Sequence, residues 1–275
     1  MEFQSRRWDL AIIGFPDDRG VLLNKGRKGA SEGPTALRHQ FYRLVPPKHQ
    51  IAIADLGDLV LSENLEADHN SASSLISVAL GNADRVVILG GGHDWGFAPI
   101  RAIADMGRAG FVNIDAHLDV RPDKVSHSGT SYWKALEGPI EGQNAIWFGI
   151  QPTVTSSFHL DYALAKGGTV FFGEDPWTDL KPYAKALSGL DQRCDAIDVS
   201  LDLDVFAMSV APGVSAPQVT GLEVPVGLTV FRAALRAPSV KTVGIYELSP
   251  THDVAGMTAR LAARCLWEVA ATKVK

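Results

Sequence analysis

The chain has 275 residues, of which 46% are hydrophobic and 21% charged, a composition that suits one large globular α/β domain or two small ones. The formal net charge of −5 and the scattered basic residues argue against nucleic acid or an anionic membrane as the main partner. Two cysteines exclude a disulfide framework, and because no signal-peptide or membrane-length apolar run is present, we expect a cytoplasmic protein without a membrane segment.

Short aliphatic runs alternate with helix-compatible segments along the whole chain. Strands are expected at 9–14, 51–55, 85–89, 110–115, 144–149, 169–173, 196–203 and 241–247. Helices are expected at 34–43, 71–81, 95–107, 130–137, 155–166, 179–190, 227–236 and 257–271, and an irregular loop at 207–226. Several strand runs are apolar throughout, which favours a parallel sheet buried on both faces. The pattern predicts a single three-layer αβα domain over residues 1–275, with a mostly parallel sheet of roughly eight strands.

Six His and Asp side chains follow three of these strands, and Glu247 follows a fourth. The six are His93, Asp115, His117, Asp119, Asp202 and Asp204. Ligands in open parallel sheets lie beyond the carboxyl ends of the strands, so we expect these side chains to converge. Alternate residues of an extended segment point the same way, so Asp115, His117 and Asp119 are expected to share one face, and so are Asp202 and Asp204.

A concentration of carboxylates after buried strands is costly unless a cation neutralises it. Oxygen and imidazole donors without thiolate suit Mn²⁺, or Fe²⁺ or Co²⁺, better than a structural zinc ion. Four carboxylates exceed the need of one divalent ion, so the sequence predicts two ions that share bridging carboxylates and activate a water. Each motif alone has a structural alternative, because an Asp-x-Asp pair often caps a turn and a lone His is often a satisfied polar residue. Their combination favours a metal site.

Four motifs, in this order along the chain, resemble the signatures of the ureohydrolases, the arginase and agmatinase group. They are Gly-Gly-Gly-His-Asp at 90–94, Asp-Ala-His-Leu-Asp at 115–119, Ser-Leu-Asp-Leu-Asp-Val-Phe at 200–206 and Glu-Leu-Ser-Pro at 247–250. The resemblance extends from about Gly14 to Ala263. Further stretches resemble the formimidoylglutamase branch: the glycine-rich loop 20–34, Asp-Val-Arg at 119–121, Ser-Gly-Thr at 128–130 and Ala-Pro-Gly-Val-Ser-Ala-Pro at 211–217.

The resemblance implies a binuclear manganese centre with two Mn²⁺ ions per subunit. His93, Asp115, Asp119 and Asp202 would hold one ion, and His117, Asp115, Asp202 and Asp204 the other. A hydroxide bridging the two ions would attack the amidine carbon of the substrate. Asp119 would pass a proton to the leaving amine, and Glu247 would pair with the cationic amidinium. Without the resemblance, the better interpretation of Glu247 is a solvent-facing residue at a strand end.

Substrate choice depends on residues downstream of Asp119. Arginases and agmatinases have a histidine where this chain has Ser128, and formimidoylglutamase-like sequences have serine there. His127, one residue earlier, is a candidate for proton transfer, or simply a solvated loop residue. Arg121 would bind a substrate carboxylate with its planar fork, or form a structural salt bridge near Pro122. Arg27 and Asn24 are weaker candidates for a second carboxylate.

These observations predict Mn²⁺-dependent hydrolysis of N-formimidoyl-L-glutamate to L-glutamate and formamide. The alternative within the group is a ureohydrolase that releases urea from guanidinobutyrate, arginine or agmatine. An alternative from another class is a metal-containing binding or regulatory protein without turnover, which only the absent loop histidine supports. The expected partner is a small amidine or guanidine that carries carboxylates, and the family resemblance implies a homo-oligomer, a trimer or hexamer.

Overall fold

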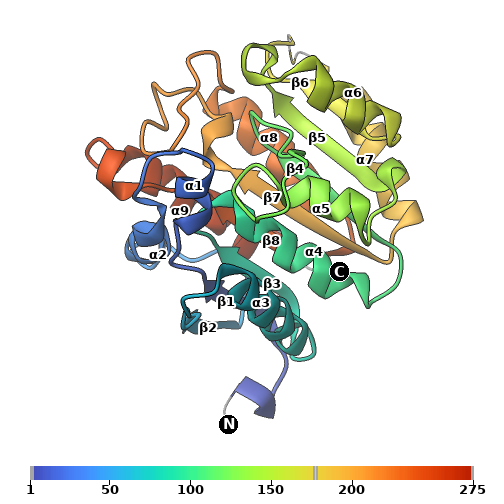
Figure 1. Ribbon diagram of the computed structural model, residues 1–275. Coiled ribbons are helices and arrows are strands. Elements are labelled where there is room, and N and C mark those ends of the chain that lie inside the picture. The colour runs from blue at the N-terminus through green and yellow to red at the C-terminus, as the bar shows by residue number, and fades with distance from the viewer. Residues whose placement is uncertain (1–2, 176, 178, 274–275) are drawn as a thin grey trace.

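A parallel sheet forms the middle layer of the computed structural model, which describes residues 3–175, 177 and 179–273 (Figure 1). Its strands are β1 Trp8–Gly14, β2 Ile53–Asp58, β3 Ala83–Leu89, β4 Ala109–Ile114, β5 Ala145–Ile150, β6 Thr169–Phe172, β7 Ala196–Asp202 and β8 Val240–Tyr246. Their order across the sheet is β2-β1-β3-β8-β7-β4-β5-β6, and each neighbouring pair is parallel. The predicted fold class is confirmed, and each predicted strand forms within a few residues of its expected bounds. The predicted domain span of 1–275 stays a prediction; residues 1, 2, 176, 178, 274 and 275 lie outside the described residues.

Helices cover both faces of this sheet (Figure 1). They are α1 Arg19–Leu23, α2 Gly33–Phe41, α3 Leu65–Leu80, α4 Phe97–Ala104, α5 Ser131–Glu137, α6 Ser157–Ala165, α7 Lys181–Arg193, α8 Val224–Leu235 and α9 Met257–Ala271. Side chains of α2, α7, α8 and α9 share one hydrophobic core with one face of the sheet. Those of α3 to α6 pack on the opposite face. Within the residues that the structure describes, no helix is long and apolar enough to span a membrane.

Strand β3 shows why the runs read as apolar throughout. Val87 and Leu89 belong to the core on one face of the sheet, whereas Val86 and Ile88 belong to the core on the other. Because successive side chains of a strand point to opposite faces, a strand covered on both sides needs apolar residues at every position.

Three local predictions differ from the structure. Helix α3 begins six residues before its predicted start at 71, because the side chain of Asn64 accepts a hydrogen bond from the Ala67 amide and caps it. Helix α1 was not predicted, since five residues are too few to show a helical period. Helix α8 begins at Val224, inside the predicted irregular loop, which otherwise holds its shape through the bridges Phe206–Leu222 and Ala207–Gln218.

The register of the central strands sets the site. Strands β3, β8, β7 and β4 are consecutive neighbours, and their pairings place Leu89 opposite Ile245, Asp202 opposite Tyr246 and Ile114 opposite Leu201. The four strands therefore end at nearly the same level. The segments that follow them, which carry the predicted His, Asp and Glu residues, start side by side at the carboxyl edge of the sheet.

Candidate metal centre

The structure brings the six predicted ligands together above the central strands. His93 begins a short 3-10 helix after β3, residues 115–119 form a turn after β4, and Asp202 and Asp204 lie at the end of β7. Their side chains form two groups with metal-ligand spacing, one of His93, Asp115 and Asp202, the other of Asp115, His117 and Asp204. Asp115 belongs to both groups, so the two candidate sites are adjacent and share a carboxylate.

The first group converges on one nitrogen. His93 Nδ1 lies 3.1 Å from Asp115 Oδ2, 3.0 Å from Asp119 Oδ2 and 3.1 Å from Asp202 Oδ2. A ring nitrogen carries at most one hydrogen, so it cannot bond to three acceptors, and this buried atom makes no hydrogen bond within the described residues. In an octahedral site with bonds of about 2.1 Å, neighbouring ligand atoms lie about 3.0 Å apart. The spacing therefore fits a cage of ligands around a divalent ion.

The second group repeats this pattern at slightly wider spacing. His117 Nδ1 lies 3.4 Å from Asp115 Oδ1 and 3.2 Å from Asp204 Oδ2. The other oxygen of Asp204, Oδ1, is buried without a hydrogen-bond partner in the part of the chain that the structure describes. The residues present therefore fit a pair of divalent ions, with hard oxygen donors in excess and one imidazole for each ion.

The convergence has a different cause from the one that the sequence suggests. Strand β4 ends at Ile114, and Asp119 has a φ of +50°, so residues 115–119 are not an extended segment with alternating faces. Asp115 Oδ1 instead accepts a hydrogen bond of 2.7 Å from the His117 amide, and Asp202 Oδ1 accepts one of 2.8 Å from the Asp204 amide. These Asx turns fold both Asp-x-His and Asp-x-Asp back over the strand ends. The prediction of shared strand faces is wrong for residues 115–119.

Buried polar groups fix the orientation of His93 and Asp115. His93 Nε2 lies 2.8 Å from Ser200 Oγ, and that contact leaves the Nδ1 lone pair directed toward the carboxylates. The side-chain amide of Asn113 donates to Asp115 Oδ2 at 3.0 Å and in turn accepts from the Tyr132 hydroxyl at 3.0 Å. The centre is thus held by a second layer of hydrogen bonds from β4, β7 and α5.

The electrostatics call for a cation. Burial raises the pKa of Asp202, and repulsion by Asp204 and Asp115 raises it further. Burial likewise raises the pKa of Asp204 to about 7, against the opposing effect of His117. Carboxylates in a protein ordinarily titrate near 4, so an ionised cluster at neutral pH needs a positive charge between its members.

Glu247 completes the site from the end of β8. Its Oε1 accepts a hydrogen bond of 2.9 Å from the His93 amide, while Oε2 is buried and makes no hydrogen bond within the described residues. Burial, followed by the charge of Asp202, raises the pKa of Glu247. A buried carboxylate with one free oxygen beside a cavity is suited to pair with a cationic group of a bound molecule.

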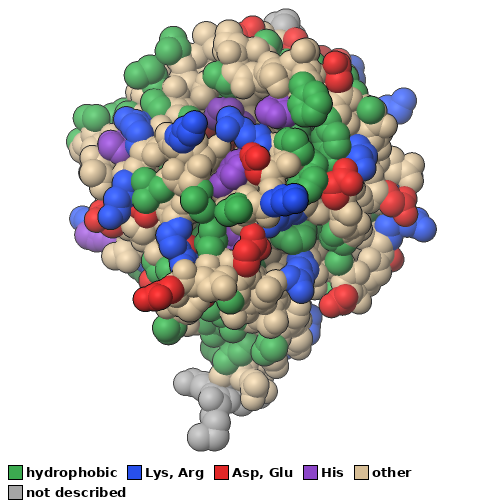
Figure 2. Space-filling model, viewed as in Figure 1, with side chains coloured by type: hydrophobic (Ala, Val, Ile, Leu, Met, Phe, Trp, Pro, Cys, Tyr) green, Lys and Arg blue, Asp and Glu red, His purple; other side chains and the backbone are tan. Residues whose placement is uncertain are grey.

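A cavity of about 280 Å³ opens above the two groups, and its lining includes all four predicted substrate-binding residues, Asn24, Arg27, Arg121 and Ser128. Arg121 Nη1 donates to Asn24 Oδ1 at 2.8 Å, and the Asn24 amide donates to Ser128 Oγ at 2.9 Å. Arg27 lines the same cavity, but its guanidinium donates to the main-chain carbonyls of Val214 and Ser215. Arg27 therefore fastens the loop 24–29 to the loop 207–223. In the view of Figure 2, histidine and basic side chains gather around an acidic one on the upper part of the molecule.

Comparison with known proteins decides the family. The model of the Arginase family matches residues 8–271. This chain belongs to the arginase family. Formimidoylglutamase of Staphylococcus aureus is 32% identical to it over 268 residues, which cover 96% of this chain and 86% of the relative.

Solved structures of the same family superpose closely on this arginase-family fold. Formiminoglutamase of Trypanosoma cruzi, solved with Mn²⁺, has a TM-score of 0.87 at 27% identity, covering 98% of this chain and 95% of that one. Formimidoylglutamase of Bacillus subtilis has a TM-score of 0.87 at 26% identity, covering 97% and 87%. Proclavaminate amidino hydrolase of Streptomyces clavuligerus has a TM-score of 0.84 at 27% identity, covering 98% and 92%.

His127 is not brought to the cavity of this arginase-family chain. It is buried, its Nδ1 accepts from the Gly129 amide at 3.1 Å, and its Nε2 lies 2.9 Å from Asp123 Oδ2. Both ring nitrogens are therefore engaged in holding the loop that carries Arg121 and Ser128. The geometry favours a structural role over the predicted proton transfer.

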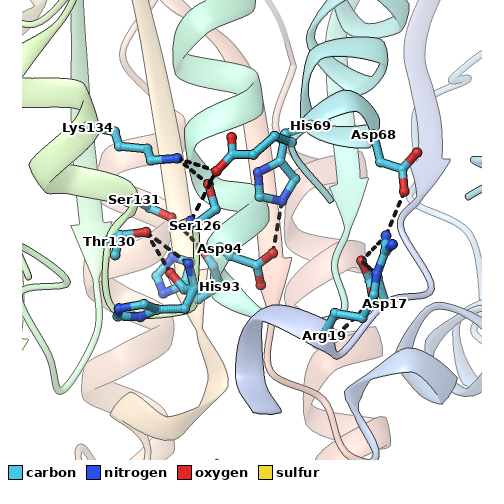
Figure 3. A network of polar contacts seen from close by, with 12 residues as sticks. Asp17, Arg19, Asp68, His69, His93, Asp94, Ser126, Thr130, Ser131 and Lys134 are labelled. Carbon is cyan, nitrogen blue, oxygen red and sulfur yellow. Dashed lines mark hydrogen bonds and ion pairs between the residues drawn. The ribbon is translucent and has the colours of Figure 1, made fainter. Parts of the chain in front are cut away.

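The same loop is anchored to helices α3 and α5 through a polar network (Figure 3). Glu66 accepts from the Ser126 amide at 3.0 Å and from Lys134 Nζ at 2.9 Å. Ser131 Oγ donates to the His93 carbonyl at 2.7 Å, which ties the start of α5 to the metal-ligand segment. Helix α5 thus contacts both the loop that carries Arg121 and Ser128 and the metal-ligand segment at His93.

The structure adds a cavity residue that the sequence did not indicate. His159, on α6, lines the cavity together with Asp119 and Arg121. Burial and the positive charge of Arg121 lower the pKa of His159, which favours the neutral imidazole. No motif marks this residue, because it follows Ser157 and Phe158 in an ordinary helix far from the strand ends; only the packing of α6 beside β6 brings it to the site.

We expect Ser200→Ala to weaken metal binding without unfolding the protein. The substitution removes the group that fixes the ring of His93, and comparable changes around metal-bound histidines lower affinity by about 10- to 100-fold. The measurement is competition for Mn²⁺ against a chelator of known affinity. Ser77→Ala, the same chemical change on α3, is the control, and equal affinities of the two variants would contradict the assigned role of Ser200.

Proposed function

We propose that this chain is a manganese-dependent formimidoylglutamase, which hydrolyses N-formimidoyl-L-glutamate to L-glutamate and formamide. The observation that carries the proposal is the presence of two opposite charges in one cavity: a buried carboxylate, Glu247, and an exposed guanidinium, Arg121, above two groups of metal ligands. This combination complements a molecule with a cationic amidine at one end and carboxylates at the other. The similarity to formimidoylglutamases over nearly the whole chain supports the same substrate.

Two Mn²⁺ ions per chain would be held by the residues described above. His93, Asp115, Asp119 and Asp202 would hold the first, and Asp115, Asp202, Asp204 and His117 the second. Once bound, such ions lower the pKa of water and so supply a hydroxide nucleophile at neutral pH. This is the chemistry that the substrate requires, because an amidinium carbon stabilised by resonance is a poor electrophile.

The chain itself orients the substrate and moves protons. The free Oε2 of Glu247 would accept a hydrogen bond from the amidinium nitrogen and hold the reacting carbon over the ligand groups. Asp119 lines the cavity, and burial raises the pKa of its carboxyl group. After the hydroxide attacks, its carboxylate would accept the proton left on the attacking oxygen and deliver it to the leaving amine, which departs as the α-amino group of glutamate.

Arg121 would select the substrate by its carboxylates. Its Nη1 is already held by Asn24, so the guanidinium is oriented before a ligand arrives. The cost of ordering a long side chain is thereby reduced. Ser128, which is fixed to Asn24, would contribute a hydroxyl to the same region. Assembly into a homo-oligomer, implied by the family, stays a prediction.

The reaction is tested by assaying Mn²⁺-treated protein on formimidoylglutamate, guanidinobutyrate, arginine and agmatine in parallel. We expect formamide from formimidoylglutamate, little urea from the other three, and loss of activity after chelation that Mn²⁺ restores. Release of urea as the main product would assign the chain to a guanidino substrate instead. Tight binding without any turnover would favour a binding or regulatory protein.

Glu247→Gln is expected to lower kcat/KM by about 100-fold, because a hydrogen bond between two charged groups is replaced by a neutral contact. Metal content should stay near that of the unaltered protein, since Glu247 is outside both ligand groups. Metal analysis and steady-state kinetics on the same preparation give both values. Glu223→Gln, on an exposed loop, is the control, and unchanged turnover of Glu247→Gln would remove Glu247 from the mechanism.

Arg121→Gln is expected to raise KM for formimidoylglutamate by about 10- to 100-fold, the effect of one charge-assisted contact. The value of kcat should change less, because a carboxylate distant from the reacting bond is bound equally in the ground state and the transition state. Arg121→Lys keeps the charge but loses the planar guanidinium. Its KM should lie between that of the unaltered protein and that of Arg121→Gln. If Arg121→Gln leaves KM unaltered, the substrate carboxylates are bound elsewhere.

A further inference from the structure

A second cavity, of about 520 Å³, lies at the edge of the sheet opposite the metal centre. It opens where β3 and β8 begin, between the last turns of α8 and α9, and its charged lining consists of Arg85, Arg232, Arg236, Glu268 and Lys273. Four of these five residues are cationic. Cavities of this size are typical of sites for small organic molecules.

Arg85 is the most unusual member of this lining. It lies inside strand β3, and only 1% of its surface is exposed. Its Nε donates to the Val240 carbonyl at 3.1 Å and its Nη2 to the Leu235 carbonyl at 2.8 Å, so part of the guanidinium caps the end of α8. Its Nη1 is buried and makes no hydrogen bond within the described residues.

A buried guanidinium normally has an anionic partner, because leaving a charge in a low-dielectric interior is costly. The acceptors of Arg85 that the structure describes are main-chain carbonyls, and no carboxylate is in ion-pair contact with it there. Burial accordingly lowers the pKa of Arg85 to about 10. The unused donors of Nη1 indicate that one partner is still to be supplied.

Glu268, the acidic residue in the lining of this cavity, cannot serve as the partner of Arg85. Glu268 is already bound by Arg232 through two hydrogen bonds of 2.8 and 2.6 Å, and it also pairs with Arg264. Arg236 and Lys273 are exposed at the mouth and form no ion pair with the residues that the structure describes. The cavity therefore has a surplus of positive charge and free donors both in its interior and at its rim.

We propose that this cavity binds a small organic or inorganic anion through carboxylate or phosphate oxygens. The buried Nη1 of Arg85 would donate to one oxygen, and Arg236 and Lys273 would neutralise the remaining charge at the mouth. The site is separate from the metal centre and uses neither Glu247 nor Arg121. It therefore stands or fails independently of the proposed hydrolase activity.

The test is a calorimetric titration of the Mn²⁺-loaded protein with inorganic phosphate and, in a separate experiment, with succinate. Because Arg85→Gln removes a cap of α8 and is expected to impair folding, the informative variant is Arg236→Gln combined with Lys273→Gln. Its matched control is Lys185→Gln combined with Lys48→Gln, which removes two exposed charges elsewhere.

We expect the cavity variant to bind its preferred anion at least tenfold more weakly than both the control and the unaltered protein. A preference for phosphate over succinate, or the reverse, identifies the group that the site recognises. Turnover of formimidoylglutamate should be the same in all three proteins in the absence of added anion. Equal affinities of the two double variants, or no binding of either anion beyond that at the metal centre, would overturn the proposal.

Discussion

Repulsion among buried carboxylates is the constraint on which the rest of this structure depends. Three carboxylate oxygens lie 3.0–3.1 Å from His93 Nδ1, where the central strands β3, β7 and β4 end. Such an arrangement is unfavourable unless cations occupy it, so the scaffold must hold the groups against their repulsion. A parallel sheet covered by helices on both faces provides that rigidity, since its strand ends are fixed by hydrogen bonds to neighbours on both sides.

The backbone at the site shows where this constraint is accommodated. Among the described residues, the non-glycine residues with positive φ are Lys25, Asp119, Glu247 and Ala255, and the first three line the metal-centre cavity. Each such conformation costs about 1–3 kcal/mol and persists only where surrounding contacts enforce it. Asp119 is held because its carbonyl accepts from the Tyr132 amide at 3.0 Å, and Glu247 because its amide donates to Gly91 at 2.9 Å. Backbone hydrogen bonds of the folded protein thus hold Asp119 and Glu247 in strained conformations that direct their side chains to the site.

The features that could be predicted from the sequence are those with a strong local signal. Apolar runs identified the strands, and the rule that ligands gather at strand carboxyl ends anticipated the meeting of His93, Asp115, Asp202 and Glu247. The turn at 115–119 could not be foreseen, because an Asx turn and an extended strand present the same alternation of residues. His159 and Arg85 depend on how α6 and α8 pack, and helix packing leaves no mark on the residues themselves.

The two edges of the sheet differ in charge for a physical reason. At the carboxyl edge, chain segments leave the strands as turns, and the carboxylates they carry collect above the central strands. At the amino edge, α8 and α9 end, and the partial negative charge of a helix carboxyl end favours arginine and lysine nearby. Arg85 uses this effect by donating to the carbonyl of Leu235 at the end of α8, yet its Nη1 makes no hydrogen bond within the described residues. The same topology that gathers metal ligands on one side therefore gathers a surplus of cations on the other, which is why a second, anionic ligand is a natural occupant of that edge.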